Sequence, residues 1–211
     1  MPIRKQLEST NLNNYSLHNL PATKLHRAVK LHSMSGILLL ATCFFIASCG
    51  TTSVPDGIKP VQGFDLQRYL GTWFEIARLD HRFERNLGDV SATYSLNDDG
   101  TVKVLNSGVY VASSKKAGKR NSATGKAKFV GDRDTGHLKV SFFGPFYGSY
   151  IVFELDEDDY QFALVAGPNR KFLWMLARQP MIDEELYQRL LEVARSNGYD
   201  TDKLIRVEQN G

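Results

Sequence analysis

The sequence predicts an all-β fold: an eight-stranded antiparallel up-and-down β-barrel with one C-terminal α-helix packed outside. From residue 63 onward, eight short segments alternate between apolar and polar residues, and turn signals rich in Gly, Asn and Asp separate them. Helical spacing appears only after the eighth segment. A meander of eight strands can close on itself, which removes exposed sheet edges and leaves room for one small ligand.

The expected strands follow one another with short connections. NDDG at 97–100 is typical of a hairpin turn, a polar, basic loop occupies 112–120, and GPF interrupts the chain after residue 143. The eight strands are expected at 72–79, 88–96, 101–111, 122–130, 137–143, 147–155, 160–166 and 172–179, and a short last strand at 203–209.

One helix is expected between the eighth and the last strand. Pro180 ends the strand pattern, Asp183 is a plausible N-cap, and the acidic Glu184 favours a helix N-terminus. Apolar residues then recur at helical spacing through Leu190, and Gly198 suits the position just after the helix. The apolar stripe should cover the barrel wall rather than form a ligand site.

The N-terminal region has the pattern of an export signal. Residues 1–48 hold five basic residues and one acidic residue, whereas the remainder holds 21 basic and 22 acidic residues. The nearly neutral body excludes a field that attracts nucleic acid. An apolar run at 36–47 is shorter than the roughly 20 residues that cross a bilayer and matches a signal-peptide core. A buried helix is the alternative interpretation.

The four residues IASC at 46–49 resemble the lipobox of bacterial lipoproteins, in which the Cys is acylated and becomes the new N-terminus. We therefore expect residues 1–48 to be a lipoprotein signal peptide that is removed, Cys49 to be lipidated, and residues 49–62 to be a flexible tether. Residues 63–211 would form the barrel domain. Cys43 would leave with the signal peptide, so no disulfide or Cys-based metal site is expected.

Three stretches carry a family resemblance. GFDLQRYLGTWFEIAR at 63–78, IVFELDEDDYQFALV at 151–165 and FLWMLAR at 172–178 resemble, in order, the three signatures of the lipocalins. DHRFER at 80–85 and FFGPFYG at 142–148 bring the chain closer to the bacterial outer-membrane lipocalins. The resemblance implies that Trp73 plugs the barrel floor, that Arg178 lies across its indole, and that Gly71 permits a tight turn before the plug.

Glu75 and Arg78 lie on the strand that follows this plug. Glu75 shares the parity of Trp73 and is expected either inside the barrel, paired with a Tyr, a basic side chain or a ligand headgroup, or in a salt bridge on the wall or in solvent. The opposite parity of Arg78 predicts the outer surface.

Aromatic side chains supply the candidate pocket. Tyr94, Phe129, Phe142 and Tyr147 are expected to line it, with Phe83 near the mouth, although barrel-wall packing is the alternative for each. Basic residues of 82–85 and 115–120 could meet a phosphate, or could be ordinary surface charge.

Catalysis is not expected. Residues 49–211 contain two His, His81 and His137, no Gly-x-Ser-x-Gly elbow and no His-x-x-x-His spacing. Gly118 and Gly125 lie too far apart for a phosphate loop. No cofactor or metal is predicted. A lipid-modifying enzyme that uses one of the two His is the least favoured alternative.

The resemblance implies a membrane-anchored lipocalin that carries or stores fatty acids or lysophospholipids in the cell envelope. It also implies an outer-membrane location, with the domain facing the periplasm. The competing hypothesis is an envelope interaction protein whose barrel is filled by side chains and takes no cargo. A homodimer is possible under either hypothesis.

Overall fold

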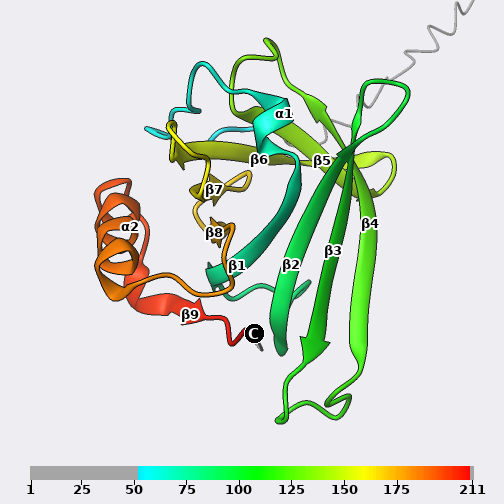
Figure 1. The fold of residues 1–211 in the computed structure, drawn as a ribbon, viewed down its shortest axis with the longest axis vertical. Helices are drawn as coiled ribbons and strands as arrows, with labels where there is room; N and C mark the ends of the chain where they lie inside the picture. Colours follow the sequence, from blue (N-terminus) through cyan, green and yellow to red (C-terminus); the bar gives the residue numbers. More distant parts are fainter. Residues whose placement is uncertain (1–51, 210–211) are drawn as a thin grey trace, which may run out of the picture. The chain divides into compact units, whose positions relative to one another are not determined.

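The structure, a computed structural model, describes residues 52–209. The strands form one antiparallel sheet in the order β2-β3-β4-β5-β6-β7-β8-β1-β9, and a further pairing of β1 with β2 closes the first eight into a barrel (Figure 1). This confirms the predicted fold class. The elements are α1 (Leu66–Tyr69), β1 (Gly71–Leu79), β2 (Leu87–Leu96), β3 (Val102–Tyr110), β4 (Arg120–Phe129), β5 (His137–Phe143), β6 (Phe146–Leu155), β7 (Phe162–Ala166), β8 (Leu173–Ala177), α2 (Glu184–Ser196), a 3₁₀ turn (Thr201–Lys203) and β9 (Leu204–Arg206).

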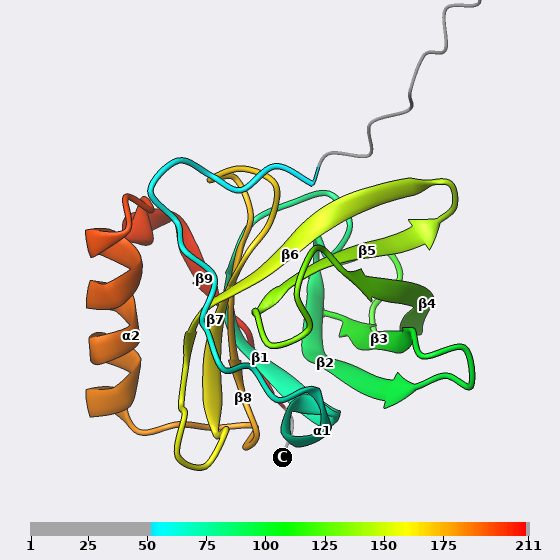
Figure 2. The same cartoon turned by 90° about the horizontal axis from the view of Figure 1, so that it is seen from above.

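The up-and-down connectivity gives the barrel two distinct ends. α1 and the turns β2–β3, β4–β5 and β6–β7 lie at one end, which we call the floor. The loops β1–β2, β3–β4, β5–β6 and β7–β8 lie at the other end, which we call the mouth. Figure 2 shows α1 on the side opposite the β7–β8 loop and the β5–β6 hairpin.

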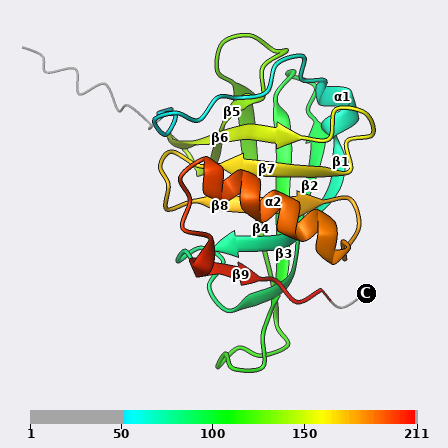
Figure 3. The ribbon, with the colours of Figure 1, turned by 90° about the vertical axis from the view of Figure 1, so that its left-hand side faces the viewer.

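The helix α2 covers the outer wall of the barrel. Asp183 caps it by accepting a hydrogen bond from the backbone N–H of Leu186, and Gly198 follows it with a φ of +80°. Tyr187, Leu190 and Ala194 are buried against the outward-facing side chains of β1, β6, β7 and β8. Figure 3 shows α2 lying across β7 and β8. A second apolar cluster lies inside the barrel, so each strand of this wall contributes side chains to two cores.

The segment before the barrel differs from the expected flexible tether. From Ser53 to residue 62 it lies along the outside of the barrel, where Ile58 is buried. Val61 donates its N–H to Val152 and accepts from Gly136, which adds main-chain pairing. The apolar residues Val54 and Ile58 favour this docking over solvation, which a reading of composition alone did not reveal. Cys49 and the expected signal peptide lie outside the described residues. Within 52–209 no helix is long and apolar enough to cross a membrane.

Candidate functional site

The floor of the barrel is built around one indole. Trp73 is fully buried and donates its Nε1–H to the carbonyl of Tyr69, 2.8 Å away. The guanidinium carbon of Arg178 lies 4.0 Å from the centre of the Trp73 ring. The same guanidinium donates to the carbonyls of three residues, namely Arg68 (2.6 Å), Thr72 (3.0 Å) and Tyr160 (3.3 Å). Arg178 therefore ties α1, β1 and the β6–β7 turn together below the indole.

Gly71 makes room for this arrangement. Its φ is +96°, in the region that side chains disfavour, and a Cβ on it would lie 3.3 Å from a terminal nitrogen of Arg178. There is thus both a conformational and a steric reason for a glycine at the first position of β1.

Three tyrosines continue the packing above the indole. The hydroxyl of Tyr150 lies 2.7 Å from that of Tyr69 and 2.8 Å from that of Tyr94. The ring centre of Tyr69 lies 4.7 Å from that of Trp73 and 5.5 Å from that of Tyr94, with the rings tilted in both pairs. Burial raises the pKa of all three phenols, so they stay neutral and share their hydroxyl protons within the network.

A β-bulge on β1 brings an ion pair inside the barrel. The pairing of β1 with β8 shifts register between Glu75 and Ala77, so Glu75 faces Leu176 and Arg78 faces Trp174. Leu176 and Trp174 both pack in the interior cluster. Arg78 is 2% exposed and donates to Glu75 across 2.6 Å. The expected outward position of Arg78 is therefore wrong, because the bulge reverses the strand parity after Glu75.

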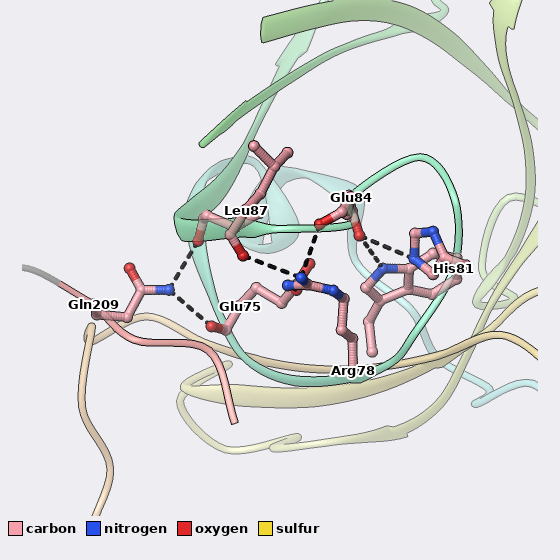
Figure 4. A network of polar contacts seen from close by, with 8 residues as sticks. Glu75, Arg78, His81, Glu84, Leu87 and Gln209 are labelled. Atoms are coloured by element: carbon pink, nitrogen blue, oxygen red, sulfur yellow. Dashed lines mark hydrogen bonds and ion pairs between the residues drawn. The ribbon is translucent and has the colours of Figure 1, made fainter. Parts of the chain in front are cut away.

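The β1–β2 loop folds over this ion pair (Figure 4). Arg78 donates to the carbonyls of Glu84 at 2.8 Å and Leu87 at 3.0 Å. The Glu84 carboxylate accepts from the Trp174 indole N–H at 3.0 Å and lies 3.0 Å from Nε2 of His81. All of these side chains are at least half-buried, so the loop is held to the barrel wall at the mouth by charges that water does not screen.

The two carboxyl groups of this cluster have opposite pKa shifts. Burial, together with the neighbouring Glu84 charge, raises the pKa of Glu75 well above its ordinary value, and Arg78 opposes this only in part. Burial alone would also raise the pKa of Glu84, but hydrogen bonds from His81 and Trp174 and the nearby positive charges lower it. The surroundings therefore favour proton binding at Glu75 and ionisation at Glu84.

Short side chains line the opposite wall of the interior. Antiparallel partners share one face of a sheet, and the pairings run from Trp73 to Ala92, then to Asn106 and on to Ala123. This row faces inward, yet Ala92, Asn106 and Ala123 remain partly exposed. Oδ1 of Asn106 is buried and has no hydrogen-bond partner among residues 52–209. The wall formed by β2, β3 and β4 thus leaves space above the floor, with one unpaired acceptor in it.

Comparisons with known proteins agree with this geometry. The family model described as "Lipocalin-like domain" matches residues 64–209. The chain belongs to the lipocalin family. It is 45% identical over 176 residues to "Outer membrane lipoprotein Blc" of Vibrio cholerae, an alignment that covers 83% of this chain and 99% of that protein. It is 49% identical over 168 residues to the Escherichia coli K12 protein of the same name, covering 80% and 92%.

One further relative is more distant in sequence, and one solved structure is similar in fold. "Temperature-induced lipocalin-1" of Arabidopsis thaliana is 40% identical over 162 residues, covering 72% of this chain and 83% of that protein. The solved structure of insecticyanin from Manduca sexta superposes with a TM-score of 0.59 at 21% identity, covering 75% of this chain and 87% of that chain. At that identity the likeness concerns the fold alone.

The lipocalin interior contains some of the expected pocket residues. Tyr94 lies inside, in the tyrosine network, and Phe129 lies inside at the floor, 6.2 Å from the ring of Phe64. Phe142 packs against the interior cluster beside Gly125, where a Cβ would lie 2.9 Å from its ring. Phe83 is 57% exposed in the β1–β2 loop at the mouth.

Tyr147 does not belong to the interior. Its neighbour Gly148 pairs with the inward-facing Val140, so Tyr147 points to the outer face. Its ring lies 5.9 Å from Nζ of Lys128 and 5.5 Å from Nζ of Lys139. Tyr147 and Phe142 are among the residues that line an outer depression of about 430 Å³, where β4 and β5 diverge. The expectation that Tyr147 lines the pocket is therefore wrong.

The sequence reasoning missed several residues of this lipocalin interior. Strand parity could have placed Tyr150 inside, since it alternates with Val152 along β6. The local sequence does not predict that Arg78 points into the barrel, because the bulge has no sequence signature here. Glu84 and Trp174 meet across 90 positions of the chain, so only the closed barrel brings them together.

Proposed function

We propose that this lipocalin is a membrane-anchored lipoprotein that binds a lipid with one acyl chain, of the fatty acid or lysophospholipid type, inside its barrel. The observation that carries the proposal is the partly exposed inner wall at Ala92, Asn106 and Ala123, above a floor that Trp73 and Arg178 close. An apolar tube closed at the floor would suit one acyl chain, because each buried methylene contributes about 0.8 kcal/mol.

Two unpaired polar atoms support a ligand with a polar head. Nε of Arg78 and Oδ1 of Asn106 are both buried and lack hydrogen-bond partners among residues 52–209. Burying such groups unpaired is costly, so a ligand that supplies an acceptor to Arg78 or a donor to Asn106 would gain free energy. Phosphate and carboxylate oxygens satisfy the first atom, and a glycerol hydroxyl satisfies the second.

The sequence and the relatives together support the proposed anchor. The IASC match ends at Cys49, and the relatives at 45% and 49% identity are named outer membrane lipoproteins. We therefore assign residues 1–48 as a cleaved signal peptide, Cys49 as the acylated residue, and the outer membrane as the location.

The alternative is an envelope interaction protein with a filled barrel and no cargo. The dense packing of Phe64, Tyr69, Trp73, Tyr94 and Tyr150 favours it for the lower half of the barrel. The short side chains of β2, β3 and β4 oppose it for the upper half, which is why lipid binding is preferred.

Calorimetric titration tests the proposal. The mature chain carrying Cys49→Ser would be delipidated and titrated with lysophospholipids and fatty acids that differ by two methylenes. We expect one site per chain, with the longer chain binding roughly 15-fold more tightly. A headgroup effect on affinity would point to Arg78 and Asn106. Failure of every amphiphile to bind would favour the filled-barrel alternative.

A further inference from the structure

The chain leaves the described domain at the mouth of the barrel. The hydroxyl of Ser53 donates to the carbonyl of Pro168, 3.0 Å away, and Pro168 lies in the β7–β8 loop. Arg170 of the same loop donates to the carbonyl of Asp56 across 2.6 Å. From there the segment runs towards the floor, where Val61 pairs with Gly136 of the β4–β5 turn. The residues before Ser53 therefore start from the mouth and not from the floor.

This attachment leaves very little chain between the domain and the proposed acyl anchor. Cys49 precedes Ser53 by four residues, which span at most about 14 Å even when fully extended. An anchor this close to the β7–β8 loop keeps that end of the barrel near the bilayer surface.

Exposed aromatic rings gather at the same end. Phe83, Phe143 and Phe146 are the three exposed phenylalanines of residues 52–209, at 57%, 73% and 67%. Phe83 lies in the β1–β2 loop, and Phe143 pairs with Phe146 at the tip of the β5–β6 hairpin. Figure 2 shows this hairpin projecting from the barrel. Exposed rings of this kind gain free energy when they enter the interface of a lipid layer.

Formal charge differs sharply between the two ends. The mouth loops at 80–86, 111–119 and 167–172 contain seven basic and two acidic residues. The floor turns at 97–101, 130–136 and 156–161 contain one basic and eight acidic residues. An anionic lipid surface therefore attracts the mouth and repels the floor.

We propose that the mouth of the barrel docks on the phospholipid surface that holds the anchor, with the floor pointing away from it. The proposal rests on the proposed lipidation of Cys49, and the exposed phenylalanines and the charge difference support it independently. In this orientation a lipid passes between the bilayer and the barrel interior without crossing bulk water. The bilayer is thus the partner that contacts the rim formed by Phe83, Phe143 and Phe146.

Site-specific fluorescence on the full-length, lipidated protein tests this orientation. Once Cys49 is acylated and Cys43 is removed, a single introduced Cys can be labelled with an environment-sensitive dye. Phe83→Cys and Phe146→Cys report on the mouth, and each leaves two rim phenylalanines in place. Asp98→Cys, in the exposed β2–β3 turn, is the matched control at the floor. The proteins would be reconstituted on vesicles of phosphatidylethanolamine and phosphatidylglycerol that carry nitroxide lipids.

We expect at least threefold stronger quenching at both mouth positions than at Asp98→Cys. Mouth quenching should increase with the phosphatidylglycerol fraction and decrease in 1 M NaCl. Equal quenching at both ends, or stronger quenching at the floor, overturns the orientation. The intact mass of the mature protein distinguishes a failure of the proposed anchor from a failure of the proposed orientation. A mass without acyl chains would contradict both proposals. An acylated protein whose mouth labels are not quenched would contradict the orientation alone.

Discussion

The guanidinium carbon of Arg178 lies 4.0 Å from the centre of the Trp73 ring, and the guanidinium donates hydrogen bonds to three separate backbone carbonyls. A planar fork can make all of these contacts at once, whereas an ammonium cannot. One side chain therefore joins the helix before the barrel, the first strand and the β6–β7 turn.

Replacing Arg178 with Lys tests this role. The substitution keeps the positive charge but loses most of the carbonyl contacts, so we expect the free energy of unfolding to fall by about 2 kcal/mol. Urea denaturation measures the change. Arg133→Lys is the matched control, since Arg133 lies 5.1 Å over Phe129 at the same end but is exposed. Similar losses in the two variants would contradict the anchoring role.

The raised pKa of Glu75 predicts a pH-dependent stability. The folded state holds the Glu75 proton more tightly than the unfolded state, so this contribution is present at low pH and is lost as pH rises above the ordinary value of 4.5. The side chain introduced by Glu75→Gln cannot ionise. The free energy of unfolding of this variant should therefore increase relative to that of the wild type between pH 4.5 and pH 8.

The control for this comparison is Glu157→Gln in the exposed β6–β7 turn, which should follow the wild type at every pH. The lowered pKa of Glu84 by itself makes the protein less stable as pH falls, but Glu84 is present in both the wild type and Glu75→Gln. A constant difference between Glu75→Gln and the wild type would show that folding does not shift the pKa of Glu75.

Filling the inner wall should block ligand binding. Ala123 faces inward and Thr124 is exposed on the outer face. Ala123→Leu adds volume to the proposed tube, so we expect at least a tenfold loss of lysophospholipid affinity in calorimetry. Thr124→Leu adds the same type of side chain one residue away and should bind normally. Normal binding by both variants would place the ligand elsewhere.

The packed N-terminal segment should depend on Arg170. This side chain donates to Asp56 and to Asn197, which joins the segment to the end of α2. In Arg170→Ala we expect faster amide hydrogen exchange in residues 53–58 with little change in β1. Lys171→Ala, which changes an exposed neighbour, is the control. Unchanged exchange in Arg170→Ala would mean that the other contacts, such as the packing of Ile58 and the Ser53 hydrogen bond, hold the segment without Arg170.

Much of the fold could be predicted because its signals are local. Alternation, turn residues and the Asp183 cap each act over a few positions, and the structure confirms the strand order and the external helix. The floor pair of Trp73 and Arg178 came from a family resemblance, since the two residues are far apart in the chain. The composition of residues 49–62 suggested a free tether, because the segment has only a few apolar residues. Those few residues nevertheless pack on the barrel.

The interior could be predicted only in part, because parity holds only while the ladder is regular. Tyr94 and Phe142 lie where alternation allows, but Tyr147 lies outside and Arg78 lies inside. In the case of Arg78, one extra residue in β1 reverses the face of everything after it. The pairing of all strands in the sheet determines where a bulge forms, so the sequence around the bulge does not predict it.

The sequence by itself determined the barrel and its helix and led us to expect an anchor at Cys49, because periodicity, caps and short motifs are properties of neighbouring residues. The tertiary structure decided which charges are buried, which wall is lined by short side chains, and at which end of the barrel Ser53 is attached. Those features depend on contacts between distant strands and loops, such as Glu84 with Trp174 and Ser53 with Pro168. Closure of the barrel creates these contacts, and no shorter piece of the chain contains them.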